Sequence, residues 1–292
     1  MTTASITRGS IVVGYAGPQD DEHALAWAAR KAALENRTLS LVHAVQPPTG
    51  YELGAMAGAY MVPDDVIDAV REGGRLALSQ GRAAVAAAYP ALEVETFLYD
   101  GAPERVLLEH AGLATCLVVG SRGRGRIASL LLGSVGIALA RSAICPIVVV
   151  RPHHPGKVRN GVLVGTDCTR NTRSTLEFAY REASLRRLPL TVLHVVPAGD
   201  PVGPDHAEHR IALAETVAGM SEKFPDVRVR TSLAAGSPDA WLASQSDAMD
   251  LLVVGHHHQS GFADAVGIGS YVPRVIATAD CPVAVVFEAP AP

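Results

Sequence analysis

A glycine-rich segment with three arginines carries the clearest candidate chemistry of this sequence. It spans residues 120–134 and reads GSRGRGRIASLLLGS. Glycine tolerates positive φ and close approach, so such a loop can point successive N–H groups at one anion. Ser134 opens a helical pattern whose N-terminus favours negative charge, and the arginines could neutralise phosphate. We therefore predict a phosphate site here, with a plain turn and a solvated basic loop as the ordinary alternatives.

An internal repeat places this loop within a larger unit that occurs twice. The segment at 11–17 matches 162–168 and the segment at 41–45 matches 192–196, both with a shift of 151. Later matches have shifts of 135 or 136 and pair 101–111 with 236–246, 116–120 with 251–255, and CPIVVV with CPVAVV. The first copy is therefore about sixteen residues longer. The additional residues of the first copy form a predicted loop at 46–65 that contains several glycines and prolines.

Each copy alternates short aliphatic runs with helical patterns, which predicts a parallel sheet flanked by helices in the order β-α-β-α-β-α-β-α-β. The fold class is α/β, with two tandem Rossmann-like domains that each hold a five-stranded parallel sheet. The predicted strands are 10–15, 39–45, 93–98, 115–120 and 146–151, then 161–166, 190–196, 227–232, 250–255 and 282–287. The predicted first-copy helices are 20–35, 64–88, 102–112 and 132–142.

Proline, serine and glycine residues at certain positions predict helix ends and domain limits. Pro103 and Pro238 suit first helical turns, and Ser134 and Ser270 are candidate caps for the last helix of each copy. The segment RPHHPGKVRN has the composition of an exposed boundary. The predicted domains are residues 1–152 and 161–292, joined by a linker at 153–160.

Composition excludes several classes of protein. A net charge of −4 with dispersed basic residues argues against nucleic acid as a partner. The first ten residues lack the apolar core of a signal peptide, and the apolar runs are too short for a bilayer, so we expect no membrane partner and a cytoplasmic location. Four cysteines without a CxxC pair indicate reduced thiols. Cys145 and Cys281 precede prolines at strand entrances, which favours packing over redox chemistry.

The pattern G-x2-G-x9-G-[S/T], which follows LVVG and precedes CPIVVV, resembles the ATP-binding signature of the universal stress protein family. The resemblance covers nearly the whole chain, twice in tandem. It implies adenine near the ends of strands one and two and phosphates on the signature loop, with ATP as the cofactor, with or without Mg²⁺. The matching positions in the first copy are Gly14 and Val42 near base and ribose, then Gly120, Ser121, Arg122, Gly123, Arg124, Gly125, Arg126, Gly133, Ser134 and Val135. Those in the second copy are Gly165, Asp167, Gly255, Gly269 and Ser270.

The two copies depart from the family pattern in opposite ways. The first has Ala16 where the family usually carries an acidic residue after strand one, whereas the second keeps Asp167. In the second loop, His258 replaces a glycine, one extra residue is inserted and Asp264 adds negative charge. We therefore rank the first copy above the second as the ATP site. One, both or neither copy binding ATP stays open at this point.

The positions of the histidines favour structural roles over metal binding or catalysis. Adjacent histidines at 256–258 do not converge easily on a metal, so an exposed loop is the favoured interpretation and no metal ligands are assigned. His43 and His194 end equivalent strands, where a hydrogen-bonded structural role is favoured over catalysis.

The leading hypothesis is a regulatory nucleotide-binding module for stress response. No base, nucleophile and orienting group occur at convincing spacing and the P-loop motif is absent, so we assign no catalytic residues and expect at most slow ATP hydrolysis. The alternatives are a dimerisation module that binds no nucleotide and an adenylating or ATP-pyrophosphatase-type enzyme. We expect the apolar closing strands of the two copies to pair about a pseudo-two-fold axis, and whole chains to form homodimers.

Overall fold

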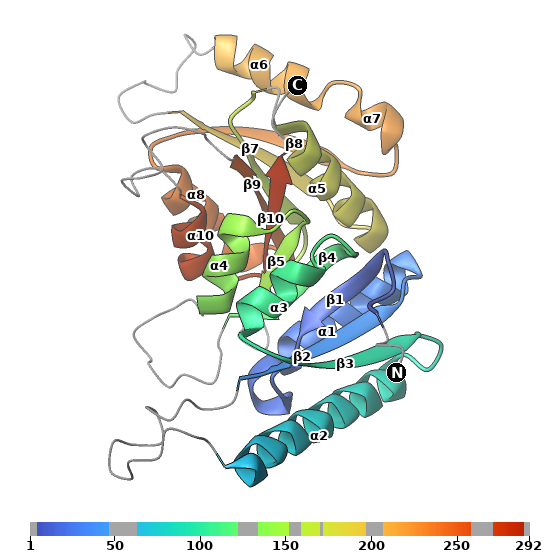
Figure 1. Ribbon diagram of the computed structural model, residues 1–292. Helices are drawn as coiled ribbons and strands as arrows, with labels where there is room; N and C mark the ends of the chain where they lie inside the picture. Colours follow the sequence, from blue (N-terminus) through green and yellow to red (C-terminus); the bar gives the residue numbers. More distant parts are fainter. Residues whose placement is uncertain are drawn as a thin grey trace, which may run out of the picture. The chain divides into compact units, whose positions relative to one another are not determined.

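The computed structural model describes residues 5–46, 63–121, 134–151, 159–169, 172–196, 207–257 and 271–288. The chain divides into two compact units, Met1–Cys145 and Pro146–Pro292. Each unit contains a sheet with helices packed against it (Figure 1). Most of the first copy's extra loop and the predicted linker up to residue 158 lie outside the described residues, so the predicted domain limits stay predictions.

The first unit holds four parallel strands in the order β3-β2-β1-β4. Their bounds are β1 (Ser10–Gly14), β2 (Leu39–Val45), β3 (Val94–Asp100) and β4 (Ala114–Gly120). The helices are α1 (Pro18–Glu35), α2 (Asp64–Ala88), α3 (Pro103–His110) and α4 (Ser134–Ser142). Helix α1 packs against α2, and α3 packs against α4.

The second unit repeats this arrangement in the order β5-β10-β9-β6-β7-β8. Its strands are β5 (Ile147–Val150), β6 (Val162–Thr166), β7 (Leu190–Val196), β8 (Val229–Ala235), β9 (Leu251–His257) and β10 (Val283–Glu288). Its helices are α5 (Arg173–Arg186), α6 (Ala207–Val217), α7 (Met220–Lys223), α8 (Pro238–Gln245) and α10 (Val272–Thr278), and a 3-10 turn spans Ser246–Ala248.

The closing strands of the two copies pair with each other, as the sequence predicts. β5 runs antiparallel to β10, with Val148 opposite Ala284, whereas the strands from β10 through β9, β6 and β7 to β8 are parallel to one another. Aliphatic strand residues fill the core: β5 is buried along its whole length, as are the central residues of β1 and β6. This burial is the main stabilising contribution to each unit.

Most predicted element bounds agree with the structure to within two residues. The bounds of β2, β7 and α2 are those predicted, and both α3 and α8 begin at a proline. Two strand predictions were wrong at their ends. β8 lies two to three residues later than 227–232, and β9 continues to His257 because His256 and His257 pair with the end of β10.

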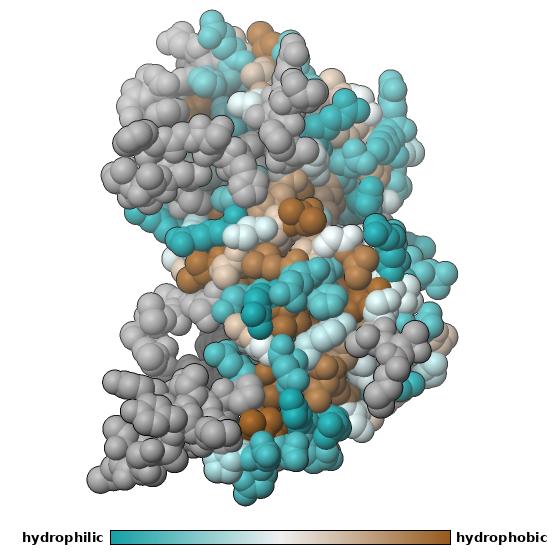
Figure 2. All heavy atoms as spheres, in the orientation of Figure 1, coloured by the Kyte–Doolittle hydropathy of each residue, from teal (hydrophilic) through white to brown (hydrophobic). Residues whose placement is uncertain are grey.

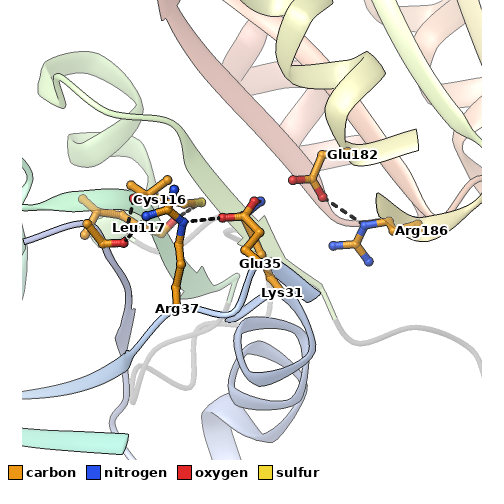
Figure 3. A network of polar contacts seen from close by, with 9 residues as sticks. Lys31, Glu35, Arg37, Cys116, Leu117, Glu182 and Arg186 are labelled. Atoms are coloured by element: carbon orange, nitrogen blue, oxygen red, sulfur yellow. Dashed lines mark hydrogen bonds and ion pairs between the residues drawn. The ribbon is translucent and has the colours of Figure 1, made fainter. Parts of the chain in front are cut away.

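Equivalent helices of the two units carry buried ion pairs of opposite polarity. On α1, Lys31 Nζ lies 2.8 Å from Glu35 Oε1, and on α5, Arg186 Nε lies 2.9 Å from Glu182 Oε2 (Figure 3). Each pair spans one helical turn, and the matching positions are 151 residues apart. All four side chains are less than a tenth exposed, so pairing offsets the cost of removing their charges from water.

The described surface mixes hydrophilic and hydrophobic residues over the face drawn in Figure 2. Exposed hydrophobic side chains include Leu76 on α2 and Ile211 on α6, each more than half exposed. Within the described ranges, no helix is both long and apolar enough to cross a membrane.

Candidate functional site

The described site residues of the first copy lie near the carboxyl ends of β1 and β4, with Val42 beside Gly14 in the middle of β2. Gly14 is the register partner of Val42, and the N–H of Tyr15 donates to the Val42 carbonyl at 2.9 Å. Gly120 ends β4, and the side chain of Ser121 just beyond it is buried. β1 lies between β2 and β4, so the direction of winding reverses here, which is where open parallel sheets bind ligands.

The phosphate segment is only partly described. Arg122, Gly123, Arg124, Gly125, Arg126 and Gly133 lie outside the described residues, as do Gly269 and Ser270 of the second copy. Helix α4 spans Ser134–Ser142, against a predicted 132–142, and Val135 is half-buried in its first turn. That turn contains no carboxylate, so the partial positive charge at the helix N-terminus has no acidic neighbour within its own first turn.

Gly14, which ends β1, and Gly165, the penultimate residue of β6, are packed closely by helix side chains. A Cβ on Gly14 would stand 3.0 Å from Cδ1 of Leu107 on α3, and one on Gly165 would stand 3.2 Å from both methyl carbons of Leu242 on α8. Both leucines are buried. The structure thus supplies a packing reason for these two glycines, independent of any ligand.

A carboxylate that the sequence analysis missed lies at the end of β1. The Ala16 N–H donates to Oδ2 of Asp21 at 2.6 Å, and Asp21 is buried although it lies in the first turn of α1. Its φ and ψ of −124° and 17° are not helical, which turns the side chain back toward the strand. The first copy therefore has an acidic group at this strand end, supplied from the helix and not from position 16.

The second copy supplies its carboxylate differently. Asp167 directly follows β6, is exposed, and its Oδ1 accepts the N–H of Thr169 at 2.9 Å. The residue equivalent to Asp21 is Thr172, whose hydroxyl donates to the Thr169 carbonyl at 2.8 Å. Each copy thus places a carboxylate against the backbone that follows its first strand, from a different sequence position.

The remaining described part of the second site departs further from the first. Gly255 lies inside β9, so the prediction that a loop begins there was wrong. His256 belongs to the same strand and packs edge-on against Phe287 at 5.5 Å between ring centroids. Helix α10 begins at Val272 with Pro273 in its first turn, which removes one N–H that an anion could use. These differences support ranking the first copy above the second.

The paired strand-end histidines hold the backbone, as expected. The Nδ1–H of His43 donates to the Tyr15 carbonyl at 2.8 Å, and that of His194 donates to the Thr166 carbonyl at 2.9 Å. Both imidazoles are buried. In the second unit, His194 Nε2 also lies 3.3 Å from Nδ1 of His209 on α6.

The cysteines at the strand entrances are core groups. Burial raises the pKa of the Cys145 thiol to about 12 and that of the Cys281 thiol to about 12, so both stay protonated and unreactive near neutral pH. Burial also raises the pKa of Tyr15 to about 12, with smaller contributions from Asp21 and Glu22. Among the described residues, no three potential acidic, histidine or cysteine ligands cluster as a metal site would require.

Comparison with known proteins finds one family along almost the whole chain. The model of the universal stress protein family matches residues 7–151 and again residues 159–286. A universal stress protein of Mycolicibacterium smegmatis is 33% identical, covering 97% of this chain and 98% of its own length. One from Mycobacterium tuberculosis strain H37Rv is 32% identical, covering 94% and 96%. The crystal structure of a universal stress protein from Archaeoglobus fulgidus has the same fold, with a TM-score of 0.71 at 18% identity over 96% of this chain and 97% of that one.

Proposed function

Since the chain belongs to the universal stress protein family as a tandem member, we propose that its first unit binds ATP and acts as a regulatory module. The observation that carries this proposal is the meeting of Gly14, Val42 and Gly120 at the switch point of the sheet. The glycine-rich segment leaves the sheet at this point and returns at the N-terminus of α4. Backbone N–H groups and a helix dipole at one edge favour a polyphosphate.

Each part of the nucleotide has candidate residues in the first unit. Adenine and ribose lie beside Gly14 and Val42, which are register partners on β1 and β2. The triphosphate lies along the glycine-rich segment and reaches Ser134 and Val135. Arg122, Arg124 and Arg126 neutralise its charge. Any Mg²⁺ arrives with the phosphates, because the described residues around this edge offer no cluster of metal ligands.

ATP bound at this site serves as a regulatory signal and not as a substrate that is turned over in a catalytic cycle. Binding of ATP at the glycine-rich segment changes the surface that partners meet, and tight binding of a ligand to the folded state stabilises it. No general base is assigned near the phosphates, so hydrolysis is slow at most. We also propose that the protein works in the cytoplasm and that whole chains form homodimers.

The test is nucleotide retention by matched variants. Mass spectrometry of the purified full chain identifies any bound nucleotide, in wild type, in Gly123→Arg and in the second-copy variant Gly269→Arg, whose glycine corresponds to Gly133. We expect ATP in wild type and in Gly269→Arg, and at least a tenfold loss in Gly123→Arg, because a side chain at position 123 fills the phosphate path. Equal loss in both variants would contradict the ranking of the copies.

A module that binds no nucleotide is the second candidate, favoured by the packing of Leu107 against Gly14, which explains that glycine without a ligand. The same experiment separates the two. If wild type carries no nucleotide and millimolar ATP produces no rise in melting temperature, the chain is an interaction module and the nucleotide proposal is wrong.

A further inference from the structure

The outer strands of the two units, β3 and β8, carry opposite charges at equivalent positions. Among the described strands, β3 pairs only with β2 and β8 pairs only with β7, so each has one edge that no described strand occupies. Residues 93–95, where β3 begins, read Glu-Val-Glu, and residues 228–230, where β8 begins, read Arg-Val-Arg. The shift of 135 that relates the later parts of the two copies relates these two triplets as well.

The backbone polar groups of Val94 and Val229 point away from the inner neighbouring strand. The carbonyls of residues 93 and 228 each accept an N–H of that neighbouring strand at 2.9 Å, so these two residues direct their backbone groups inward. Backbone groups alternate in direction along a strand, so those of the following valines face outward. Each outer edge therefore presents the N–H and C=O of one valine between two charged residues.

Neither triplet is neutralised by the described part of its own unit. Arg228 and Arg230 are exposed, and among the described residues neither guanidinium has a hydrogen bond or an ion pair. The described donors to Glu93 and Glu95 are hydroxyl and amide groups, such as the hydroxyl of Thr38 at 3.0 Å from Glu93 Oε2. A strand of opposite charge is therefore the complement that each outer edge lacks.

Charge excludes two of the three pairings that these edges allow. β8 against β8 would set arginine beside arginine, and β3 against β3 would set glutamate beside glutamate, which is unfavourable and is a common means of preventing edges from joining. β3 against β8 sets glutamate beside arginine. The repulsion in the two like pairings and the attraction in the mixed pairing together select one partner.

We propose that copies of this chain associate head to tail, with β3 of one copy antiparallel to β8 of the next. Val94 and Val229 lie opposite each other as a hydrogen-bonded pair and exchange N–H···O=C bonds in both directions. The flanking glutamates and arginines, 93 with 230 and 95 with 228, then occupy the non-hydrogen-bonded positions, where opposite side chains approach most closely. The partner is a second copy of this chain.

The contact joins two different surfaces, so a free β3 edge and a free β8 edge remain at the ends of each assembly. The smallest product is a dimer, and longer chains of subunits form as the protein concentration rises. A contact that is limited to a few residues is weak, with a Kd of roughly 0.1–1 mM. The inference rests on the proposed association of whole chains and does not involve the nucleotide site.

Small-angle X-ray scattering of the full-length protein, at concentrations up to millimolar, measures the average mass of the assemblies. We expect this mass to rise with concentration and to fall as salt is raised from about 0.1 M to about 1 M. Arg228→Glu with Arg230→Glu makes both outer edges acidic and should weaken association at least tenfold. Arg30→Glu with Arg82→Glu makes the same change of net charge at exposed residues of α1 and α2, and should change association less than threefold.

A mixture of variants separates this contact from a loss of folding. Glu93→Arg with Glu95→Arg makes both outer edges basic and should be monomeric alone, but an equimolar mixture with the acidic-edge variant restores opposite charges at every contact and should associate again. Glu93→Gln with Glu95→Gln, which keeps acceptors for the neighbouring hydroxyls, should weaken association at least threefold even if the basic-edge variant does not fold.

Three results overturn the proposal: a wild type that stays monomeric up to millimolar concentration, an acidic-edge variant that associates as the control does, or a mixture of folded acidic-edge and basic-edge variants that stays monomeric. The second result leaves self-association standing but moves it to another surface. Nucleotide content is measured on the same samples and should equal that of wild type in the edge variants. Failure of this inference is therefore distinguishable from failure of the ATP proposal.

Discussion

Replacing each of two adjacent glycines in the middle of α2 by alanine should change the stability of the first unit in opposite directions. A Cβ on Gly73 would meet nothing within 4 Å, whereas one on Gly74 would stand 2.7 Å from Cδ1 of Leu98 and 2.9 Å from Cδ2 of His43. The leucine methyl can rotate away. The imidazole cannot, because it is buried and held by its hydrogen bond to the Tyr15 carbonyl. His43 therefore determines whether alanine at position 74 raises or lowers the free energy of unfolding.

The magnitudes follow from two opposing effects. Alanine is favoured over glycine in a helix interior by about 0.5–1 kcal/mol, so Gly73→Ala should stabilise the first unit by about that amount. Gly74→Ala gains the same helix preference but overpacks a fixed ring, which costs about 1–3 kcal/mol. We expect a net loss of about 1–2 kcal/mol. For a domain of this size, a difference of about 2 kcal/mol between the variants separates their melting temperatures by roughly 4–8 °C.

Tryptophan fluorescence can follow this comparison in the first unit alone. Trp27 lies in α1 and Trp241 in α8, so a Trp241→Phe background leaves a single probe in the first unit. Both alanine variants are then unfolded in urea beside that parent. Equal stabilisation by the two substitutions would refute the argument, since it would mean that the ring of His43 yields freely. In a His43→Ala background, Gly74→Ala should cost little or no stability relative to His43→Ala alone if the ring is the obstacle.

Three further predictions concern buried polar groups. The thiols of Cys145 and Cys281 have pKa values of about 12 in the folded protein, against an ordinary value of 9.0, so the unfolded state loses these protons at lower pH. The free energy of unfolding should therefore fall as pH rises from 9 to 12. Urea denaturation at each pH measures this fall, which should be smaller in the double variant Cys145→Ala with Cys281→Ala. Glu182→Gln should cost about 1.5–3 kcal/mol by replacing the carboxylate that Arg186 Nε meets at 2.9 Å with a neutral amide. Exposed Glu208→Gln is the control, and equal stabilities of the two variants would contradict this. Asp21→Ala should cost about 1–3 kcal/mol by removing the acceptor of the Ala16 N–H, whereas Asp20→Ala, one residue earlier and exposed, should change the melting temperature little.

Periodicity in the sequence predicts the elements where one pattern dominates. The bounds of α2 follow from a long helical pattern that ends before Tyr89 and Pro90, and those of β2 follow from an aliphatic run. β9 was predicted too short because His256 and His257 have the polarity of a loop, and only their partners on β10 keep them in the sheet. β8 was misplaced because its first three residues, Val229 to Thr231, are exposed and carry no burial pattern.

The site was predictable where it depends on strand ends and not where it depends on packing. Parallel strands bring their carboxyl ends together, so Gly14, Val42 and Gly120 could be assigned to one edge from their order alone. Asp21 could not, because the neighbouring Asp20 has the same residue type and only the turn of the helix decides which one faces inward.

In the antiparallel pair of β5 and β10, each strand pairs with a strand of different sequence and not with a second copy of itself. In a symmetric dimer of identical chains, a strand at the two-fold axis must suit a copy of itself, so every substitution appears on both sides. Here the two partners are separate stretches of one polypeptide, and β10 has six residues against four in β5. Dilution cannot separate them as it would separate the subunits of a dimer, because their effective concentration is set by the connecting chain. Such permanent partnership lets the two copies diverge while the pairing of their closing strands is retained.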